Sequence, residues 1–289
     1  MNITEYTLNE TQKSTFGEIP AVGLDIGSRA TKGVLLAEGK IKAALVPSGV
    51  SSKETANRVL DILLRAGNIQ KTDVEYLVGT GYGRIALEIG DIHSQVLTEI
   101  SCHAMGAYVL NPGTKTVIDI GGQDSKAIKV DNSNGKVIEF IMNDKCAAGT
   151  GRFLEKVAQL LNLTLEELGE CALQAVNPAE ISSQCVVFAE SEVISLKARG
   201  VSREDIAAGI HLATARRVKT LLRKIGLEPS ILFTGGVTNN QGMRKALEDV
   251  LETQLADAPF DTTFAGALGA AVYAGHFAAE KQAHYAEGL

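Results

Sequence analysis

The sequence predicts an α/β fold with two similar lobes, each built from one copy of a duplicated unit of β-sheet and helices. An internal repeat is the first observation: residues 25–32 (DIGSRATK) and 119–126 (DIGGQDSK) share the pattern D-I-G-x-x-x-[ST]-K. Each copy lies between two short apolar runs, so each predicts a strand, a tight polar turn and a second strand. Elsewhere, strand-like segments alternate with helix-like ones, which favours helices packed on sheets.

Each copy of the repeat is followed by further elements. After the first copy we expect a strand at 41–46, a helix at 54–66, and a strand at 76–78 before the glycine-rich residues 79–83. After the second copy we expect strands at 137–142, 183–188 and 230–233, and helices at 152–162, 165–174, 203–225, after 239 and near 264. These elements divide into a flexible polar arm (1–18), a first lobe (19–112 plus 263–289) and a second lobe (113–262).

Composition excludes several classes of protein. The 289 residues are 45% hydrophobic with a formal net charge of -6, and the basic residues are dispersed, which argues against nucleic-acid binding. No apolar run approaches the roughly 18 residues that a membrane-spanning helix needs, and the first residues are polar. We therefore expect a cytoplasmic protein that has no membrane or nucleic-acid partner.

The two repeated turns are suited to bind phosphate. Turns rich in Gly, Ser and Thr expose backbone N–H groups to phosphate oxygens, and the aspartates at the strand ends, Asp25 and Asp119, are suited to hold Mg²⁺ through water. Lys32 and Lys126 would offset phosphate charge. The other expected phosphate-binding residues are Gly27, Ser28, Thr31, Gly121, Gly122 and Ser125. One such turn alone would more often be an ordinary hairpin, but two equivalent copies favour a nucleotide site.

A third segment agrees with the two turns. Residues 232–240 (LFTGGVTNN) predict a strand that ends in Gly235 and Gly236 before a helix. Such a segment suits a nucleotide whose base and ribose pack on the backbone and whose phosphates face the helix N-terminus. With this segment, the two repeats resemble the phosphate and adenosine motifs of the actin-like ATPase superfamily, over about residues 20–280. That resemblance implies an actin-like fold with ATP or ADP in a cleft between the lobes. By position, Asp119 and Gln123 are the candidates for activating water.

Two of the four cysteines lie in distinctive segments. Cys146 stands just before a predicted helix, where the positive end of the helix dipole favours a thiolate, and Cys185 begins the segment 185–193 (CVVFAESEV). Two thiols cannot complete an iron-sulfur or zinc site, since both usually need four ligands, but a twofold dimer would supply each thiol twice. On chemistry alone, two ordinary thiols remain an alternative.

The segments 143–153 (NDKCAAGTGRF), 185–193 and 119–126 together resemble the family of 2-hydroxyglutaryl-CoA dehydratase activators and benzoyl-CoA reductase ATP-binding subunits. The resemblance implies a homodimer with one 4Fe-4S cluster, ligated by Cys146 and Cys185 of both subunits. Cys102 and Cys171 would then be core or surface thiols.

The same resemblance implies an ATPase coupled to electron transfer. Ferredoxin or flavodoxin would supply the electron, and an iron-sulfur dehydratase acting on a (R)-2-hydroxyacyl-CoA would receive it. A benzoyl-CoA reductase subunit is the nearest alternative. A sugar-type small-molecule kinase and a non-redox nucleotide-dependent binding protein are alternatives of another class, but neither explains the segment around Cys146.

Overall fold

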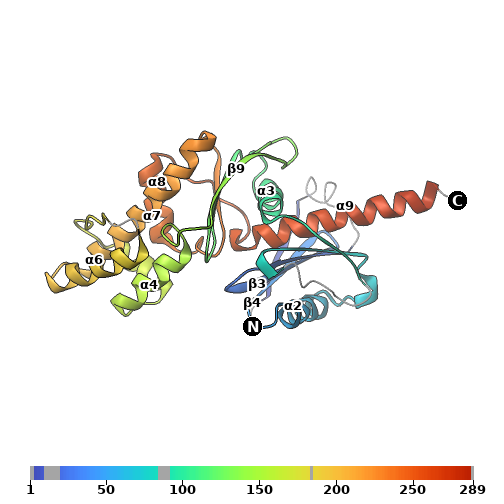
Figure 1. The fold of residues 1–289 in the computed structure, drawn as a ribbon. Helices are drawn as coiled ribbons and strands as arrows, with labels where there is room; N and C mark the ends of the chain where they lie inside the picture. The colour runs from blue at the N-terminus through green and yellow to red at the C-terminus, as the bar shows by residue number, and fades with distance from the viewer. Residues whose placement is uncertain (1–2, 10–19, 84–91, 183–184, 288–289) are drawn as a thin grey trace. The chain divides into compact units, whose positions relative to one another are not determined.

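The computed structural model describes residues 3–9, 20–83, 92–182 and 185–287 (Figure 1). The chain divides into two compact units. Unit 1 comprises Met1–Pro112, Asn132–Val137 and Ala258–Leu289, and unit 2 comprises Gly113–Asp131 and Ile138–Asp257. Among the helices of the described residues, none is long and apolar enough to span a membrane.

Unit 1 contains a mixed sheet with helices on both faces. Its elements are β1 (Ile3–Thr7), β2 (Ala21–Ile26), β3 (Ala30–Ala37), β4 (Lys40–Pro47), α2 (Ser52–Gly67), η1 (Lys71–Asp73), β5 (Tyr76–Thr80), β6 (His93–Val96), α3 (Glu99–Leu110), η3 (Thr262–Phe264) and α9 (Ala265–Glu287). The strands lie in the order β1-β4-β3-β2-β5-β6. β2 pairs antiparallel with β3 and parallel with β5.

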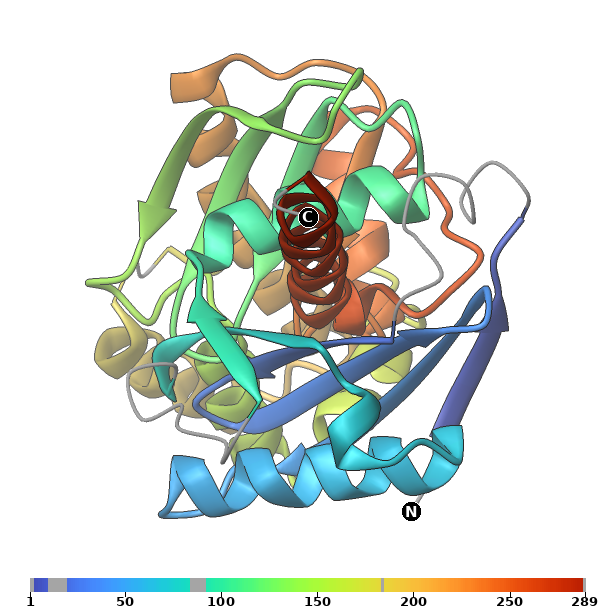
Figure 2. The same cartoon turned by 90° about the vertical axis from the view of Figure 1, so that its right-hand side faces the viewer.

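The two faces of this sheet follow from the alternation of side chains along β2. Val22 and Leu24 pack in one apolar cluster with α2 residues such as Leu60, whereas Ala21 packs on the other face with Cys102 of α3 and Ala270 of α9. Figure 2 shows α2 (light blue) and α9 (dark red) on opposite faces of the sheet. Glycine lets α9 approach closely, because a Cβ at Gly23 would lie 2.0 Å from the Ala267 carbonyl oxygen.

Unit 2 contains a smaller sheet with the strand order β10-β7-β8-β9. Its elements are β7 (Thr116–Ile120), β8 (Ser125–Val130), β9 (Val137–Asn143), α4 (Gly151–Leu161), α5 (Leu165–Ala172), α6 (Val186–Ala198), α7 (Arg203–Ile225), β10 (Ile231–Thr234) and α8 (Gln241–Leu251). β7 pairs antiparallel with β8 and parallel with β10. One continuous apolar cluster joins the sheet to helices α4 to α8.

Most predicted elements form within one to three residues of their expected bounds, and α7 has the bounds predicted for it. The predicted strand at 183–188 is wrong: Val186–Ala198 form helix α6, and residues 183–184 lie outside the described part of the chain. The residue types Val, Val and Phe favour a strand locally, but Ala189, Val193 and Leu196 are buried at helical spacing against unit 2.

The predicted flexible arm also needs a correction. Ile3–Thr7 form strand β1, which pairs antiparallel with β4, and Glu5 lies 3.0 Å from Lys40 Nζ. The polar composition of this segment suits a strand at the edge of a sheet, where both faces can contact water. Residues 10–18 of the predicted arm lie outside the described residues.

Candidate functional site

The first repeat forms the hairpin between β2 and β3. Asp25 stands opposite Lys32 in the antiparallel register, and Lys32 Nζ lies 3.0 Å from Asp25 Oδ2. Asp25 is buried, whereas Ser28 in the turn is exposed. Ser48 of the loop after β4 closes the hairpin by donating to the Gly27 carbonyl oxygen at 2.6 Å, and its hydroxyl lies 3.1 Å from that of Thr31. The hairpin therefore presents its turn to solvent from a fixed base.

The second repeat forms the equivalent hairpin between β7 and β8, with an additional carboxylate. Lys126 Nζ lies 3.0 Å from Asp119 Oδ2 and 2.9 Å from Asp124 Oδ2, and all three side chains are buried. In this arrangement the lysine contacts both carboxylates and its charge balances one of the two negative charges. The sequence prediction, which gave Lys126 only to phosphate, overlooked Asp124.

The turn of the second hairpin contains the remaining predicted residues. Gly121 N donates to the Asp124 carbonyl oxygen at 3.0 Å, Gly122 is half-buried and Gln123 is exposed. Ser125 Oγ is buried and has no hydrogen-bond partner within the described residues. A buried hydroxyl in that state has a donor and an acceptor to offer to a ligand or water.

Each aspartate has a further neighbour besides its lysine, a Thr-Gly pair at the end of the adjacent parallel strand. Gly235 follows β10 with φ +99°, and a Cβ there would lie 2.6 Å from Asp119 Oδ1 and 2.4 Å from the Ile120 carbonyl oxygen. Gly81 follows β5 with φ +85°, and its Cβ would lie 2.7 Å from Asp25 Oδ1. A side chain at either position would be strained by the positive φ and would collide with the aspartate, so both positions require glycine.

The two units thus repeat a larger constellation than the sequence pattern showed. Thr234 Oγ1 donates to Asp119 Oδ1 at 3.1 Å, which fixes that carboxylate from the β10 side. The predicted Gly236 is exposed and has open space around it. Gly235 was predicted from the sequence, but the equivalent Thr80-Gly81 pair was not, although both follow a parallel strand that neighbours the aspartate.

Helix α4 begins directly on the second hairpin. Gly151 N donates to the Gly121 carbonyl oxygen at 2.9 Å, and Arg152 N donates to the Gly122 carbonyl oxygen at 3.0 Å. These are backbone N–H groups at the start of a helix, which need partners outside the helix. The hairpin and the start of α4 are therefore joined by backbone hydrogen bonds.

The loop just before α4 contains Cys146. Asn143 at the end of β9 donates through Nδ2 to the carbonyl oxygens of Cys146 at 2.8 Å and Ala148 at 3.1 Å. Thr150 occupies the N-cap position, as its residue type suggests, but its hydroxyl donates to the Ala147 carbonyl oxygen at 2.7 Å. The half-buried thiol of Cys146 therefore lies on a loop held at both ends.

Cys185 is exposed and lies at the N-cap position of α6, whereas Cys146 lies in the loop four residues before the N-cap of α4. α4 and α6 pack together and are joined by the ion pair of Lys156 with Glu190, at 3.3 Å. Ser182, shortly before Cys185, donates from N and Oγ to Glu192 Oε1, both at 3.0 Å.

The other two cysteines have different surroundings. Cys102 is fully buried between α3 and α9 of unit 1, where a Cβ at Gly269 would lie 1.8 Å from the Cys102 carbonyl oxygen. Burial and, to a lesser degree, the Glu204 carboxylate raise the pKa of the half-buried Cys171 thiol. The environment of Cys171 therefore favours the neutral thiol.

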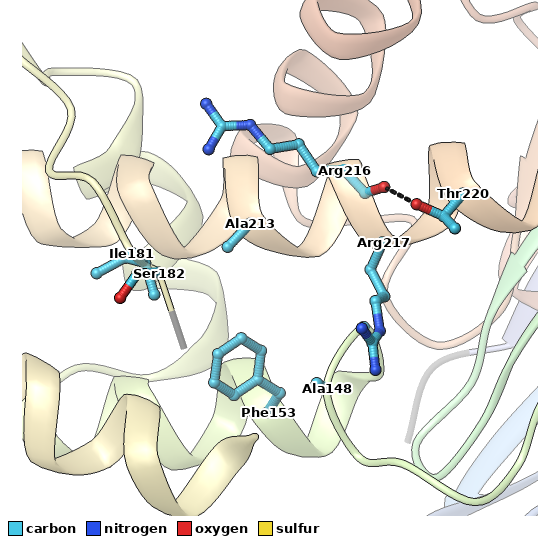
Figure 3. A pocket seen from close by; sticks show the side chains of 9 residues that line it. Ala148, Phe153, Ile181, Ser182, Ala213, Arg216, Arg217 and Thr220 are labelled. Atoms are coloured by element: carbon cyan, nitrogen blue, oxygen red, sulfur yellow. Dashed lines mark hydrogen bonds between the residues drawn. The ribbon is translucent and has the colours of Figure 1, made fainter. Parts of the chain in front are cut away.

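A cavity of about 240 Å³ opens between α7 and the cysteine loop (Figure 3). Ala148, Gly149 and Phe153 line one side of it, and Arg216 and Arg217 line the other. Figure 3 shows the guanidinium group of Arg217 pointing toward the loop that carries Ala148, whereas that of Arg216 points away from it.

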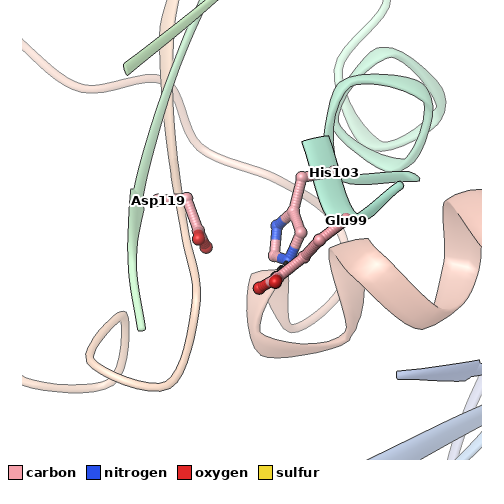
Figure 4. A group of neighbouring side chains, drawn as sticks. All are labelled: Glu99, His103 and Asp119. Atoms are coloured by element: carbon pink, nitrogen blue, oxygen red, sulfur yellow. Dashed lines mark ion pairs between the residues drawn. The ribbon is translucent and has the colours of Figure 1, made fainter. Parts of the chain in front are cut away.

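A buried histidine lies beside the first aspartate, within unit 1. His103 Nε2 is 3.9 Å from Glu99 Oε1 on the same helix, α3 (Figure 4). A Cβ at Gly266 would lie 2.7 Å from His103 Nε2 and 3.3 Å from Asp25 Oδ2, so the imidazole and this carboxylate approach each other across a glycine. His103 was not predicted from the sequence. The third residue labelled in Figure 4, Asp119, belongs to unit 2 and is described above.

Comparison with known proteins shows the family to which this chain belongs. A family profile described as the BadF/BadG/BcrA/BcrD ATPase family matches residues 22–274. The chain belongs to this ATPase family. Among its relatives, the activator of lactoyl-CoA dehydratase from Anaerotignum propionicum is 47% identical, over 90% of this chain and 99% of that protein. The (R)-2-hydroxyglutaryl-CoA dehydratase activating ATPase of Acidaminococcus fermentans is 43% identical, over 89% of this chain and 97% of that protein.

Another relative, a benzoyl-CoA reductase subunit from Thauera aromatica, is 36% identical over 90% of this chain and 94% of that protein. Among solved structures, the activator of the 2-hydroxyisocaproyl-CoA dehydratase from Clostridium difficile with bound ADPNP matches with a TM-score of 0.85 and 42% identity, over 92% of this chain and 97% of that one. A glucokinase from Streptomyces griseus, 14% identical with a TM-score of 0.55 over 89% of this chain and 99% of that one, shares the fold alone. The predicted actin-like fold and the predicted family are confirmed.

Proposed function

We propose that this chain is the ATP-hydrolysing activator of a (R)-2-hydroxyacyl-CoA dehydratase, and that two copies of it share one 4Fe-4S cluster. Relatives named as dehydratase activators, matched over almost their whole length, support the choice of partner. The observation that carries the mechanism is the pair of hydrogen bonds from Gly151 and Arg152 to the second hairpin, because they connect a phosphate-binding turn to the loop of Cys146.

The two hairpins supply the residues of the proposed nucleotide site. The glycine turns at Gly27 and Gly121 would bind phosphate oxygens through backbone N–H groups, and Asp25 and Asp119 would hold Mg²⁺. Burial of Lys126 with two carboxylates gives this lysine the role of holding Asp119 in place. Gln123, exposed at the tip of the turn, is the candidate that orients the attacking water.

The thiols of this chain fit an iron-sulfur cluster in their chemistry. Such a cluster is bound by thiolates, and neither Cys146 nor Cys185 is buried; Cys185 stands at the positive end of α6 and Cys146 lies in the loop that leads into α4. When bound, the cluster would supply one-electron chemistry. Each chain contributes two such sulfurs, so a dimer would provide the four ligands that a cluster needs.

Coupling between the two sites would proceed through α4. A change in the backbone of Gly121 or Gly122 on exchange of ATP for ADP alters the acceptors of the first two N–H groups of α4, and α4 begins beside Cys146. A nucleotide shifts such an equilibrium only to the extent that it contacts the two states unequally. The electron would come from ferredoxin or flavodoxin, and the dehydratase would receive it.

Anaerobic protein tests this proposal. We expect about two irons per chain, since one 4Fe-4S cluster is shared by two chains. An iron chelator should remove iron faster in ATP than in ADP, and Asp119→Asn, which keeps a group able to contact Lys126 and Thr234, should lose the difference while retaining iron. Four irons on a monomer, or equal removal rates in ATP and ADP with the parent protein, would contradict the proposal.

A benzoyl-CoA reductase subunit is the second candidate, favoured by the 36% identity with the Thauera aromatica protein. Reconstitution separates the two. The parent protein with MgATP and a reductant should activate a 2-hydroxyacyl-CoA dehydratase component and should leave the other subunits of a benzoyl-CoA reductase inactive.

A further inference from the structure

Arg217 reaches the sulfur of Cys146 from a distant part of unit 2. Its Nη2 lies 3.6 Å from Cys146 Sγ, although the two residues are 71 positions apart in the chain. Arg217 lies on α7, and its side chain crosses to the loop before α4 (Figure 3). Both residues are half-buried, so the guanidinium group is partly shielded from the water that would weaken its electrostatic effect.

The loop is shaped to admit this arginine. Gly149 has φ +89°, and a Cβ at this position would lie 3.0 Å from Arg217 Cγ and 3.3 Å from its Cβ. Any other residue at position 149 would therefore press on the stem of the arginine. Asn143 also holds the loop, because it donates hydrogen bonds to the carbonyl oxygens of Cys146 and Ala148. The position of Cys146 therefore does not depend on Arg217 alone.

We propose that Arg217 is a positioning residue for the iron-sulfur group, and that its N–H donation to the Cys146 sulfur raises the reduction potential of that group and slows its loss. The inference rests on the proposed function. Reduction adds a negative charge, so a nearby cation stabilises the reduced form more than the oxidised one. Hydrogen bonds to the ligating sulfurs act in the same direction and are an established means of setting such potentials.

Arg216 provides a matched control on the same helix. It carries the same charge and precedes Arg217 by one residue, but its guanidinium group points away from the cysteine loop (Figure 3). The variants Arg217→Gln and Arg216→Gln therefore lose the same net charge from neighbouring positions. A difference between them reports the contact with Cys146 and not the overall charge of the protein.

The experiment is an anaerobic redox titration of the loaded dimer, followed by the electron paramagnetic resonance signal of the reduced cluster. For Arg217→Gln we expect at least a tenfold shift of the one-electron equilibrium toward the oxidised form, which is a potential lower by about 59 mV. Arg216→Gln should keep the parent potential, and Arg217→Lys should lie between the two. A chelator should remove iron faster from Arg217→Gln than from Arg216→Gln.

Equal potentials in the two glutamine variants would overturn the inference. Should Arg217→Gln take up no iron, its unfolding midpoint without iron decides: a midpoint equal to that of Arg216→Gln supports a role at the cluster, and a lowered one shows a role in folding and overturns the inference. A parent protein that binds no iron would refute the proposed function, and the inference with it. A parent that binds iron with unchanged potentials in both variants refutes the inference alone.

Discussion

Replacement of Lys126 by methionine should destabilise unit 2 more than the same change at Lys32 destabilises unit 1. Lys126 is 1% exposed and lies within 3.0 Å of two buried carboxylates, whereas Lys32 is 12% exposed and pairs with the Asp25 carboxylate. Removing one member of a buried ionic group costs about 3–5 kcal/mol, because the remaining charges stay buried without compensation. Losing one charged hydrogen bond at the less buried site costs about 1.5–3 kcal/mol.

The assay has to resolve the two units, which need not unfold together. Urea denaturation by circular dichroism gives the overall change, and hydrogen exchange of the amides in β7 and β8 reports unit 2 separately from β2 and β3. We expect Lys126→Met to accelerate exchange in β7 and β8 selectively. The double variant Lys126→Met with Asp124→Asn should recover part of the loss, since it removes one uncompensated charge. A Lys126→Met cost no larger than that of Lys32→Met would refute the reasoning.

The same geometry leads to three further expectations. Gly235→Ala should lower the unfolding free energy by more than about 1 kcal/mol, because position 235 has a positive φ and its Cβ would lie 2.4 Å from a carbonyl oxygen. The adjacent Gly236→Ala, which has open space around it, should not. Equal urea midpoints for the two variants would contradict this expectation. Burial lowers the pKa of His211 on helix α7. Its imidazole therefore takes up a proton at a lower pH in the folded state than in the unfolded state, where it does so near pH 6.5. Stability should therefore fall as the pH drops below about 6.5, by at most about 1.4 kcal/mol per pH unit, and melting curves at pH 7.5 and 5.5 should show a weaker dependence in His211→Gln than in the parent. Cys146→Ser and Cys185→Ser should lose iron in anaerobic protein while Cys171→Ser keeps it; iron loss from Cys171→Ser would show that the ligand set is wrong.

The repeat in the sequence predicted both hairpins because its pattern encodes the local geometry. Asp25 and Lys32 are seven residues apart across a short turn, and the antiparallel register of β2 with β3 places them opposite each other. The Thr80-Gly81 pair was missed because its partner strand is parallel and distant in sequence, so no local spacing reveals it. Comparing residues 77–81 (LVGTG) with 231–235 (ILFTG) could have suggested it.

Tertiary packing decided the remaining differences. The segment after Cys185 contains strand-favouring residues, yet it forms α6 because the helical spacing of Ala189, Val193 and Leu196 matches the apolar cluster of unit 2. Arg217 carried no signal in the sequence, since its approach to Cys146 depends on how α7 packs against a loop. Arg216 and Arg217 are identical in type, and only the fold distinguishes them.

Strand β1 has a consequence for how the protein behaves at high concentration. It covers the outer edge of β4, whose side chains Ile41, Ala43, Ala44 and Val46 are buried. A chain beginning at Pro20 would leave the backbone N–H and C=O groups on the outer edge of β4 unpaired, as a template for a strand of another molecule. β1 replaces that edge with a strand of five residues carrying Glu5 and two threonines, which is a poor template for aggregation. The family match begins at Val22, so this protection against self-association lies outside the residues that the family profile matches.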